Sequence, residues 1–345
     1  MRVVSFSYFN QITPARMGMV FASAGVLIYA ASNSLATMLV DIGQGSPVAG
    51  GRNAITFTNL FLLGSLISLV PLFAMFHGDW TQAALRRLTR RDWVFLNLSA
   101  LLSCAVTPGL FIFALEQSSV TNIALISRIE PPVFLLAAGV LLKERIDARI
   151  LIAGLIALIG AGMILVLRQP GDIGGFGMGD VAAALATLSY VASALVARRV
   201  LRTVPMGIFS IYRTAAGTTL YFVLISALKG PDAFQDVLSP VLLSWIWLYA
   251  LPVVVVGQLA WTLALKHARS GDMALASSFT PLAAIVFAML LLGEDPGPGL
   301  LPGGALILLA ICVGRIKGPL LPDLAVVWLR VHDWTTGRGR IAAVT

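Results

Sequence analysis

Ten long apolar runs dominate this sequence, and short polar segments separate them. A helix needs about 20 consecutive apolar residues to cross the hydrocarbon core of a bilayer, and each run is close to that length. The composition agrees, because 58% of the residues are hydrophobic, only 12% are charged and the mean hydropathy is +0.90. We therefore predict an all-α integral membrane protein with ten transmembrane helices, at residues 17–40, 53–76, 93–115, 120–142, 148–168, 180–200, 206–228, 241–265, 273–293 and 299–316.

The positive charges indicate how these helices are oriented. The net charge of +8 would suggest a nucleic-acid partner in a soluble protein, but here the charges lie between apolar runs rather than on one face. If the N-terminus is cytoplasmic, nineteen of the twenty-four lysines and arginines fall in segments on the cytoplasmic side, and three fall on the opposite side. Positive residues concentrate in cytoplasmic loops. We therefore predict that both termini are cytoplasmic and that the chain contacts a lipid bilayer, not nucleic acid.

An internal repeat divides the chain into two halves. When the sequence is shifted by 150 residues, ALEQSSVTNIALISRIEPPVFLLAAGVLLKE, from Ala114, aligns without a gap with ALKHARSGDMALASSFTPLAAIVFAMLLLGE, from Ala264. The first span also resembles the sixth, in the segments YAAS from Tyr29 and YVAS from Tyr190. Because each half has five spans, an odd number, the second half enters the membrane from the opposite side. Inverted repeats of this kind (5+5) are typical of secondary transporters, whose substrate site lies near the bilayer midplane between the halves.

The quoted segments also carry a family resemblance. The block EPPVFLLAAGVLLKER, its weaker counterpart TPLAAIVFAMLLLGE and the opening of the second half, GDVAAALATLSYVASALVARR, resemble the EamA family of the drug/metabolite transporter (DMT) superfamily. The resemblance implies a carrier of the bacterial cytoplasmic (inner) membrane, usually an exporter of amino acids, related metabolites or toxic compounds. It also implies a central cavity between the halves and alternating access by rocking. The segment LGEDPGPGLLPGG departs from the family pattern, so we expect an unusual connection between the ninth and tenth spans.

On this basis the chain divides into five parts. They are a cytoplasmic N-terminal segment (1–16), a first EamA-like repeat (17–168), a linker (169–179), a second EamA-like repeat (180–316) and a cytoplasmic tail (317–345). The linker is rich in glycine, which is typical of a flexible connector. In the tail, apolar residues from Leu324 to Trp334 recur at helical spacing. An amphipathic helix on the inner membrane surface and a frayed tail both remain open for that segment.

Two ionisable side chains, Arg128 and Glu130, lie inside the fourth span. Charged groups in a span cost about 2.5–3.5 kcal/mol on insertion scales and mark functional sites. Glu130 is either a proton or substrate-amine site or a structural carboxyl bonded to a neighbouring helix. Arg128 either binds a carboxylate or phosphate of the substrate, or snorkels outward or pairs with Glu116. Residues two apart do not share a helix face, so we predict that Arg128 and Glu130 are poor partners for each other. Arg213, near the cytoplasmic end of the seventh span, leaves snorkelling and substrate binding open.

Prolines predict breaks in two of the spans. Pro131 and Pro132 in the fourth span and Pro281 in the ninth lack a backbone N–H, so they interrupt the helical hydrogen bonds. Backbone carbonyls freed in this way can line a cavity. Other polar or aromatic side chains in the spans are predicted to line that cavity or to pack the helices together: Tyr29, Asn33, Tyr190, Tyr212, Gln258, Trp261, Ser277 and Thr280.

Nothing in the sequence indicates a cofactor, a metal site or catalysis. His77, His267 and His332 lie outside the predicted spans, and Cys104 and Cys312 fall within apolar runs. We therefore predict a secondary transporter rather than an enzyme, a monomer or homodimer that exports amino acids, related small metabolites or toxic compounds by proton coupling or exchange. A lipid-linked precursor flippase of the same superfamily is the alternative. A membrane protein that is not a transporter is a remote alternative.

Overall fold

The computed structural model describes residues 14–48, 50–118, 120–144, 146–168 and 177–315. Within these ranges all the long elements are helices, and the one β contact is an isolated bridge between Val48 and Arg52. Nine stretches of the described chain are long and apolar enough to cross a membrane, and a tenth helix is apolar but has only 16 residues. This confirms the predicted all-α membrane fold and is consistent with ten spans. The predicted tail helix lies outside the described residues, as do most of the predicted N-terminal segment and linker.

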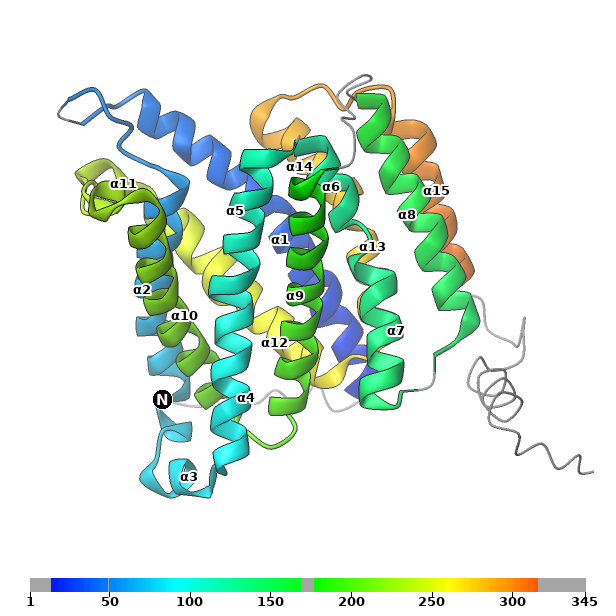
Figure 1. The fold of residues 1–345 in the computed structure, drawn as a ribbon, viewed down its shortest axis with the longest axis horizontal. Coiled ribbons are helices and arrows are strands. Elements are labelled where there is room, and N and C mark those ends of the chain that lie inside the picture. Colours follow the sequence, from blue (N-terminus) through cyan, green and yellow to red (C-terminus); the bar gives the residue numbers. More distant parts are fainter. Residues whose placement is uncertain (1–13, 49, 119, 145, 169–176, 316–345) are drawn as a thin grey trace, which may run out of the picture.

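The helices of the first half (Figure 1) follow the predicted spans, but the first extends beyond its predicted bounds at both ends, from Pro14 to Gln44, and the second begins later than predicted, at Phe57. They are α1 (Pro14–Gln44), α2 (Phe57–Phe76), α3 (Gln82–Arg87), α4 (Arg90–Leu101), α5 (Thr107–Gln117), α6 (Val120–Ser127), α7 (Glu130–Leu142) and α8 (Ala148–Arg168). Those of the second half are α9 (Met178–Val200), α10 (Met206–Lys229), α11 (Pro240–Tyr249), α12 (Gln258–His267), α13 (Ser270–Ser278), α14 (Thr280–Leu292) and α15 (Leu300–Arg315). Short 3₁₀ turns lie at His77–Asp79 and Pro231–Phe234.

The fourth and ninth spans are each interrupted, at positions 150 residues apart. The first interruption, between α6 and α7, contains Arg128 and Ile129, and the second, between α13 and α14, contains Phe279. Ile129 has φ −70° and ψ −11°, and Phe279 has φ −80° and ψ −13°. Each of these two residues donates its N–H to the carbonyl three residues earlier and accepts from the N–H four residues later. Pro131 and Pro281 follow two residues after them, so the same local sequence produces the same break in both halves.

The third and eighth spans contain a different irregularity. A π-helical turn, Leu102–Val106, joins α4 to α5, and a second, Ala250–Gly257, joins α11 to α12. Wide turns of this kind are uncommon and occur frequently at functional sites. Both lie in the same part of their repeat, so the repeat extends to backbone geometry that residue identities do not reveal.

Contacts between the halves hold the bundle together. In Figure 1, α1 and α12 cross the bundle obliquely, and they pack against each other; α1 also packs on α14. At one edge α8 and α15 lie side by side with Gly160 and Gly303 in their interface. A Cβ atom at Gly160 would lie only 2.6 Å from the carbonyl oxygen of Gly303, so glycine permits this close backbone approach. Spans from both repeats therefore surround the centre of the molecule.

Candidate functional site

A cavity of about 360 Å³, the first cavity, lies at the level of the two helix breaks. Its walls come from both repeats and include residues on either side of each break. The lining residues are Val26, Tyr29, Ser127, Arg128, Glu130, Pro131, Gly154, Ala157, Leu158, Ala161, Tyr190, Arg213, Trp261, Ser277, Ser278, Thr280 and Pro281.

The break between α6 and α7 places both Arg128 and Glu130 on the wall of the first cavity. On an uninterrupted helix two residues with this spacing would point to different sides. Both reach the same cavity here because α6 ends at Ser127 and α7 begins at Glu130, with Arg128 in the joint between them. The guanidinium Nε of Arg128 donates to the carbonyl oxygen of Ala124 at 3.3 Å, which holds the side chain beside the cavity.

Aromatic groups and a second arginine form other parts of this wall. Tyr29 on α1 and Trp261 on α12 meet edge to face, with ring centroids 6.3 Å apart. Arg213 on α10 donates from Nε to the hydroxyl of Ser103 at 3.3 Å, and its guanidinium carbon lies 5.8 Å from the centre of the Phe209 ring. Arg213 therefore points into the bundle, and the snorkelled arrangement that we left open is not the one seen.

A second cavity, of about 320 Å³, adjoins the first. Tyr29 and Arg213 line both cavities, so they form the wall between them. Gln258 lines the second cavity, where its Nε2 donates to the hydroxyl of Thr214 at 2.8 Å. The full lining is Tyr29, Ser32, Phe61, Ser65, Ser103, Cys104, Arg213, Thr214, Gly217, Thr218, Tyr249, Val253, Val254 and Gln258.

The structure places three of the sequence candidates away from both cavities. Asn33 is exposed on α1, and Pro132 is buried, with its Cβ 3.9 Å from where a Cβ of Gly154 would lie. The hydroxyl of Tyr212 donates to Asn97 Oδ1 at 2.8 Å, so this tyrosine links α10 to α4. The other candidates line the first cavity, or in the case of Gln258 the second.

Sequence reasoning identified Tyr29, Arg213 and Gln258 but missed the other polar residues of the second cavity. Thr214 and Thr218 lie one turn apart on α10, and each hydroxyl could be taken for an ordinary packing contact. Ser103 and Cys104 reach the cavity from the π turn after α4. The one-turn spacing of the threonines is a signal in the sequence, and Pro108, just after the π turn, is another.

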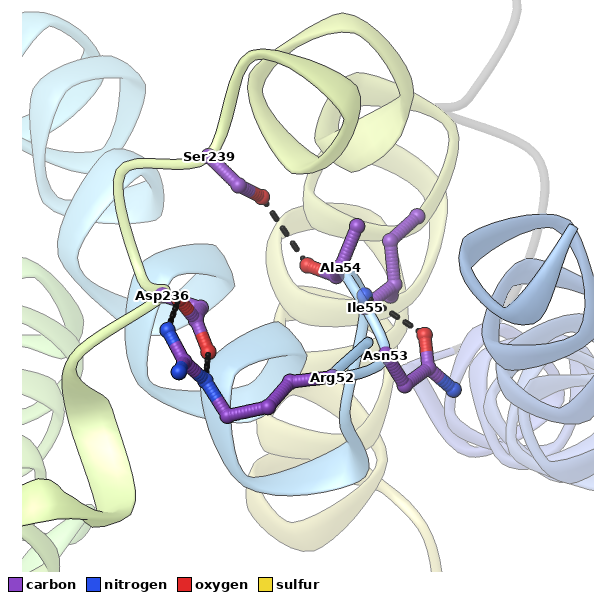
Figure 2. A network of polar contacts seen from close by, with 6 residues as sticks. All are labelled: Arg52, Asn53, Ala54, Ile55, Asp236 and Ser239. Carbon is purple, nitrogen blue, oxygen red and sulfur yellow. Dashed lines mark hydrogen bonds and ion pairs between the residues drawn. The ribbon is translucent and has the colours of Figure 1, made fainter. Parts of the chain in front are cut away.

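At one end of the bundle, polar contacts connect loops of the two halves (Figure 2). Arg52, between α1 and α2, binds both carboxylate oxygens of Asp236, between α10 and α11, at 2.8 and 2.9 Å. The hydroxyl of Ser239 donates to the carbonyl oxygen of Ala54 at 2.9 Å. The hydrogen bonds from Arg52 hold the pKa of Asp236 below its usual range, and the same pairing raises the pKa of Arg52.

At the opposite end, a second network connects the halves. Arg198 on α9 lies with its Nη2 3.6 Å from Glu144, which follows α7. Arg198 also donates to the hydroxyl of Ser270 and to the carbonyl oxygen of Ala268. The Ser270 N–H donates to Glu144 Oε2 at 3.3 Å. Contacts between repeats are thus present at both ends of the bundle, with the two cavities between them.

Comparisons with known proteins agree with this architecture. The profile of the EamA-like transporter family matches residues 16–166 and again residues 177–314. An "uncharacterized transporter sll1164" from Synechocystis sp. is 36% identical over 316 residues, which cover 90% of this chain and 90% of the relative. The fold also matches a solved crystal structure of a protein with a TM-score of 0.68 and 19% identity, over 86% of this chain and 95% of that one. The chain therefore belongs to the EamA-like transporter family and is a membrane transporter of the drug/metabolite transporter superfamily.

Proposed function

We propose that this transporter exports amino acids or related small zwitterionic metabolites from the cytoplasm by alternating access. The observation that carries the proposal is the presence of a guanidinium, Arg128, and a carboxyl group, Glu130, on the wall of one cavity between the repeats. A cavity of about 360 Å³ is within the size range of small-molecule sites. Opposite charges in one enclosed site suit a ligand that carries both a carboxylate and an ammonium group.

Each charged group then has a partner on the substrate. Arg128 binds the substrate carboxylate, since a guanidinium can donate two parallel hydrogen bonds to it. Glu130 accepts from the substrate ammonium group, and its protonation couples proton movement to substrate release. The faces of Tyr29 and Trp261 favour a cation beside them. Ser277 and Thr280 supply hydroxyl groups from the second break.

Contacts at the two ends support alternating access. The Arg52–Asp236 pair connects the halves at the end that we propose to be periplasmic, and the Glu144–Arg198 pair connects them at the proposed cytoplasmic end. With contacts formed at both ends, the arrangement fits an occluded state. Opening toward either side separates one pair while the other is kept.

Transport by purified protein in liposomes tests the role of Glu130. Radiolabelled amino acids that raise the melting temperature of the protein are loaded on one side, and their movement is followed from pH 5 to pH 8. Glu130→Gln keeps the shape of the side chain but removes the titratable group, so we expect slow transport with little dependence on pH. Asp295→Asn, at an exposed acidic residue away from both cavities, serves as the matched control. A Glu130→Gln variant with the wild-type rate and pH profile would show that coupling does not involve this residue.

A further inference from the structure

The second cavity is distinct from the first in the chemistry of its walls. Apart from Arg213, which it shares with the first cavity, the described residues around it are uncharged. Hydroxyl groups come from Thr214 and Thr218 on α10, an amide comes from Gln258, and a phenol comes from Tyr249. Walls of this kind can hydrogen-bond a neutral polar group, but beyond Arg213 they offer no charge to balance an ionised one.

Both π-helical turns contribute to this cavity. Ser103 and Cys104 belong to the turn that follows α4, and Val253 and Val254 belong to the turn that precedes α12. The two turns come from different repeats and lie at matching places in them, yet they reach the same cavity. A π turn departs from regular α-helical hydrogen-bond geometry, and such turns occur frequently at functional sites. Their convergence on one space is a separate indication that the space has a role.

The position of Arg213 relates the second cavity to the first. Its Nε donates to Ser103, a residue of the second cavity, while its side chain also lines the first cavity, as Glu130 does. Tyr29 lies on the same dividing wall. A ligand whose charged end occupies the first cavity would therefore meet uncharged hydrogen-bonding groups where it passes this wall.

We propose that the second cavity is a specificity subsite that receives an uncharged, hydrogen-bonding tail of the substrate, such as an amide or hydroxyl group. This inference rests on the proposed function, because the first cavity is taken to hold the zwitterionic end of the same molecule. Thr218 is a specificity residue in this arrangement, because it is buried on the cavity wall. Its hydroxyl group donates to the Thr214 carbonyl oxygen at 2.7 Å, so the hydroxyl oxygen of Thr218 can still accept a hydrogen bond from the ligand.

Cys104 provides a direct reporter for occupation of this subsite. The chain has two cysteines, so the variant Cys312→Ser leaves Cys104 as the one thiol in the full-length protein. Its rate of modification by methyl methanethiosulfonate is followed by intact mass, alone and with saturating L-alanine or L-glutamine. Both amino acids carry the same charged end, and only L-glutamine has an amide tail. We expect L-glutamine to slow the modification several-fold and L-alanine to leave it nearly unchanged.

Thr218→Val and Thr219→Val form a matched pair of variants. Thr219 is the neighbouring residue, and it also donates to the carbonyl four residues earlier, but it is exposed on the outer side of α10. Loss of one hydrogen bond to the ligand corresponds to a change in affinity of about two- to tenfold. We therefore expect Thr218→Val to lower the ratio of L-glutamine to L-alanine affinity by that factor, and Thr219→Val to preserve the ratio.

The outcomes separate this inference from the proposed function. If both amino acids bind, by melting temperature, but neither protects Cys104 or both protect it equally, the subsite is refuted and the first cavity keeps its proposed role. If Cys104 is not modified in the absence of amino acids, the second cavity is closed to solutes and the subsite is again refuted. If neither amino acid binds, the proposed function fails, and the subsite fails with it. Equal effects of the two threonine variants would remove the role given to Thr218.

Discussion

The packing of α8 against α15 makes a sharp prediction about stability. At Gly160 an added Cβ would lie 2.6 Å from the carbonyl oxygen of Gly303 and 3.0 Å from Leu306 Cβ, against an ordinary contact of at least 3.4 Å. The backbone oxygen cannot rotate away as the end of a side chain can. Gly160→Ala therefore forces α8 and α15 apart by several tenths of an ångström along their contact.

The expected cost of this change combines two opposing effects. Overpacking of a close interface typically costs about 1–3 kcal/mol. Replacing glycine by alanine inside a helix returns about 0.5–1 kcal/mol, because the unfolded chain loses freedom. We expect Gly160→Ala to lower the free energy of unfolding by about 1 kcal/mol, which is the difference between the middle values of these two ranges. A melting curve of the purified protein in detergent would show this as a fall of several degrees in Tm.

Gly154→Ala on the same helix is the matched control. An added Cβ there has ordinary contact with its nearest neighbour, Pro132 Cβ at 3.9 Å. The helix-propensity gain is then not offset, and we expect an unchanged or slightly raised Tm. Equal melting temperatures for Gly160→Ala and Gly154→Ala would refute the close backbone contact between α8 and α15.

Two further predictions concern the networks at the ends of the bundle. Arg198→Met leaves the buried partners of Arg198 without their donor and should cost about 1–3 kcal/mol of unfolding free energy. Arg202→Met, which removes a more exposed arginine 3.9 Å from Glu144, should cost less than about 1 kcal/mol. Urea titration of both variants measures the two losses of unfolding free energy. Because the folded-state pKa of Asp236 is lowered, its pairing with Arg52 stabilises the protein above the unfolded pKa and is lost as the pH falls through the folded one. Arg52→Gln should therefore lower Tm at pH 7, with a difference from wild type that begins to shrink only as the pH falls below about 4; a constant difference down to the lowest pH measured would contradict the ion pair.

Much of the fold is predictable because it follows from local sequence properties. The apolar runs give the spans, since their lengths match the bilayer, and the alignment from Ala114 with Ala264 gives the repeat. Pro131 and Pro281 give the positions of the two breaks, because proline removes a backbone donor wherever it occurs. These inferences need no knowledge of how distant segments pack.

The composition of the site is less predictable because it depends on geometry. Reasoning from helical spacing separates Arg128 from Glu130, but the joint between α6 and α7 rotates one relative to the other and brings both to the cavity. The π turns change which residues face inward, and although Pro108 and Pro252 lie beside and within them, proline alone does not say which residues turn inward. Asn33 shows the converse: a polar residue in a span suggests an inner surface, whereas its side chain is exposed in the structure.

The joints at Ile129 and Phe279 have a mechanical consequence. A continuous helix resists bending because each of its backbone hydrogen bonds must be strained, whereas a joint has few bonds to strain. Each of these spans thus consists of two helical segments connected by a flexible joint near its middle. The two joints lie at equivalent positions of the two repeats. One half-span can tilt while the other keeps its packing. In the alternating access that we propose, the half-spans at one face tilt while those at the opposite face stay closed, so that the two faces open at separate times.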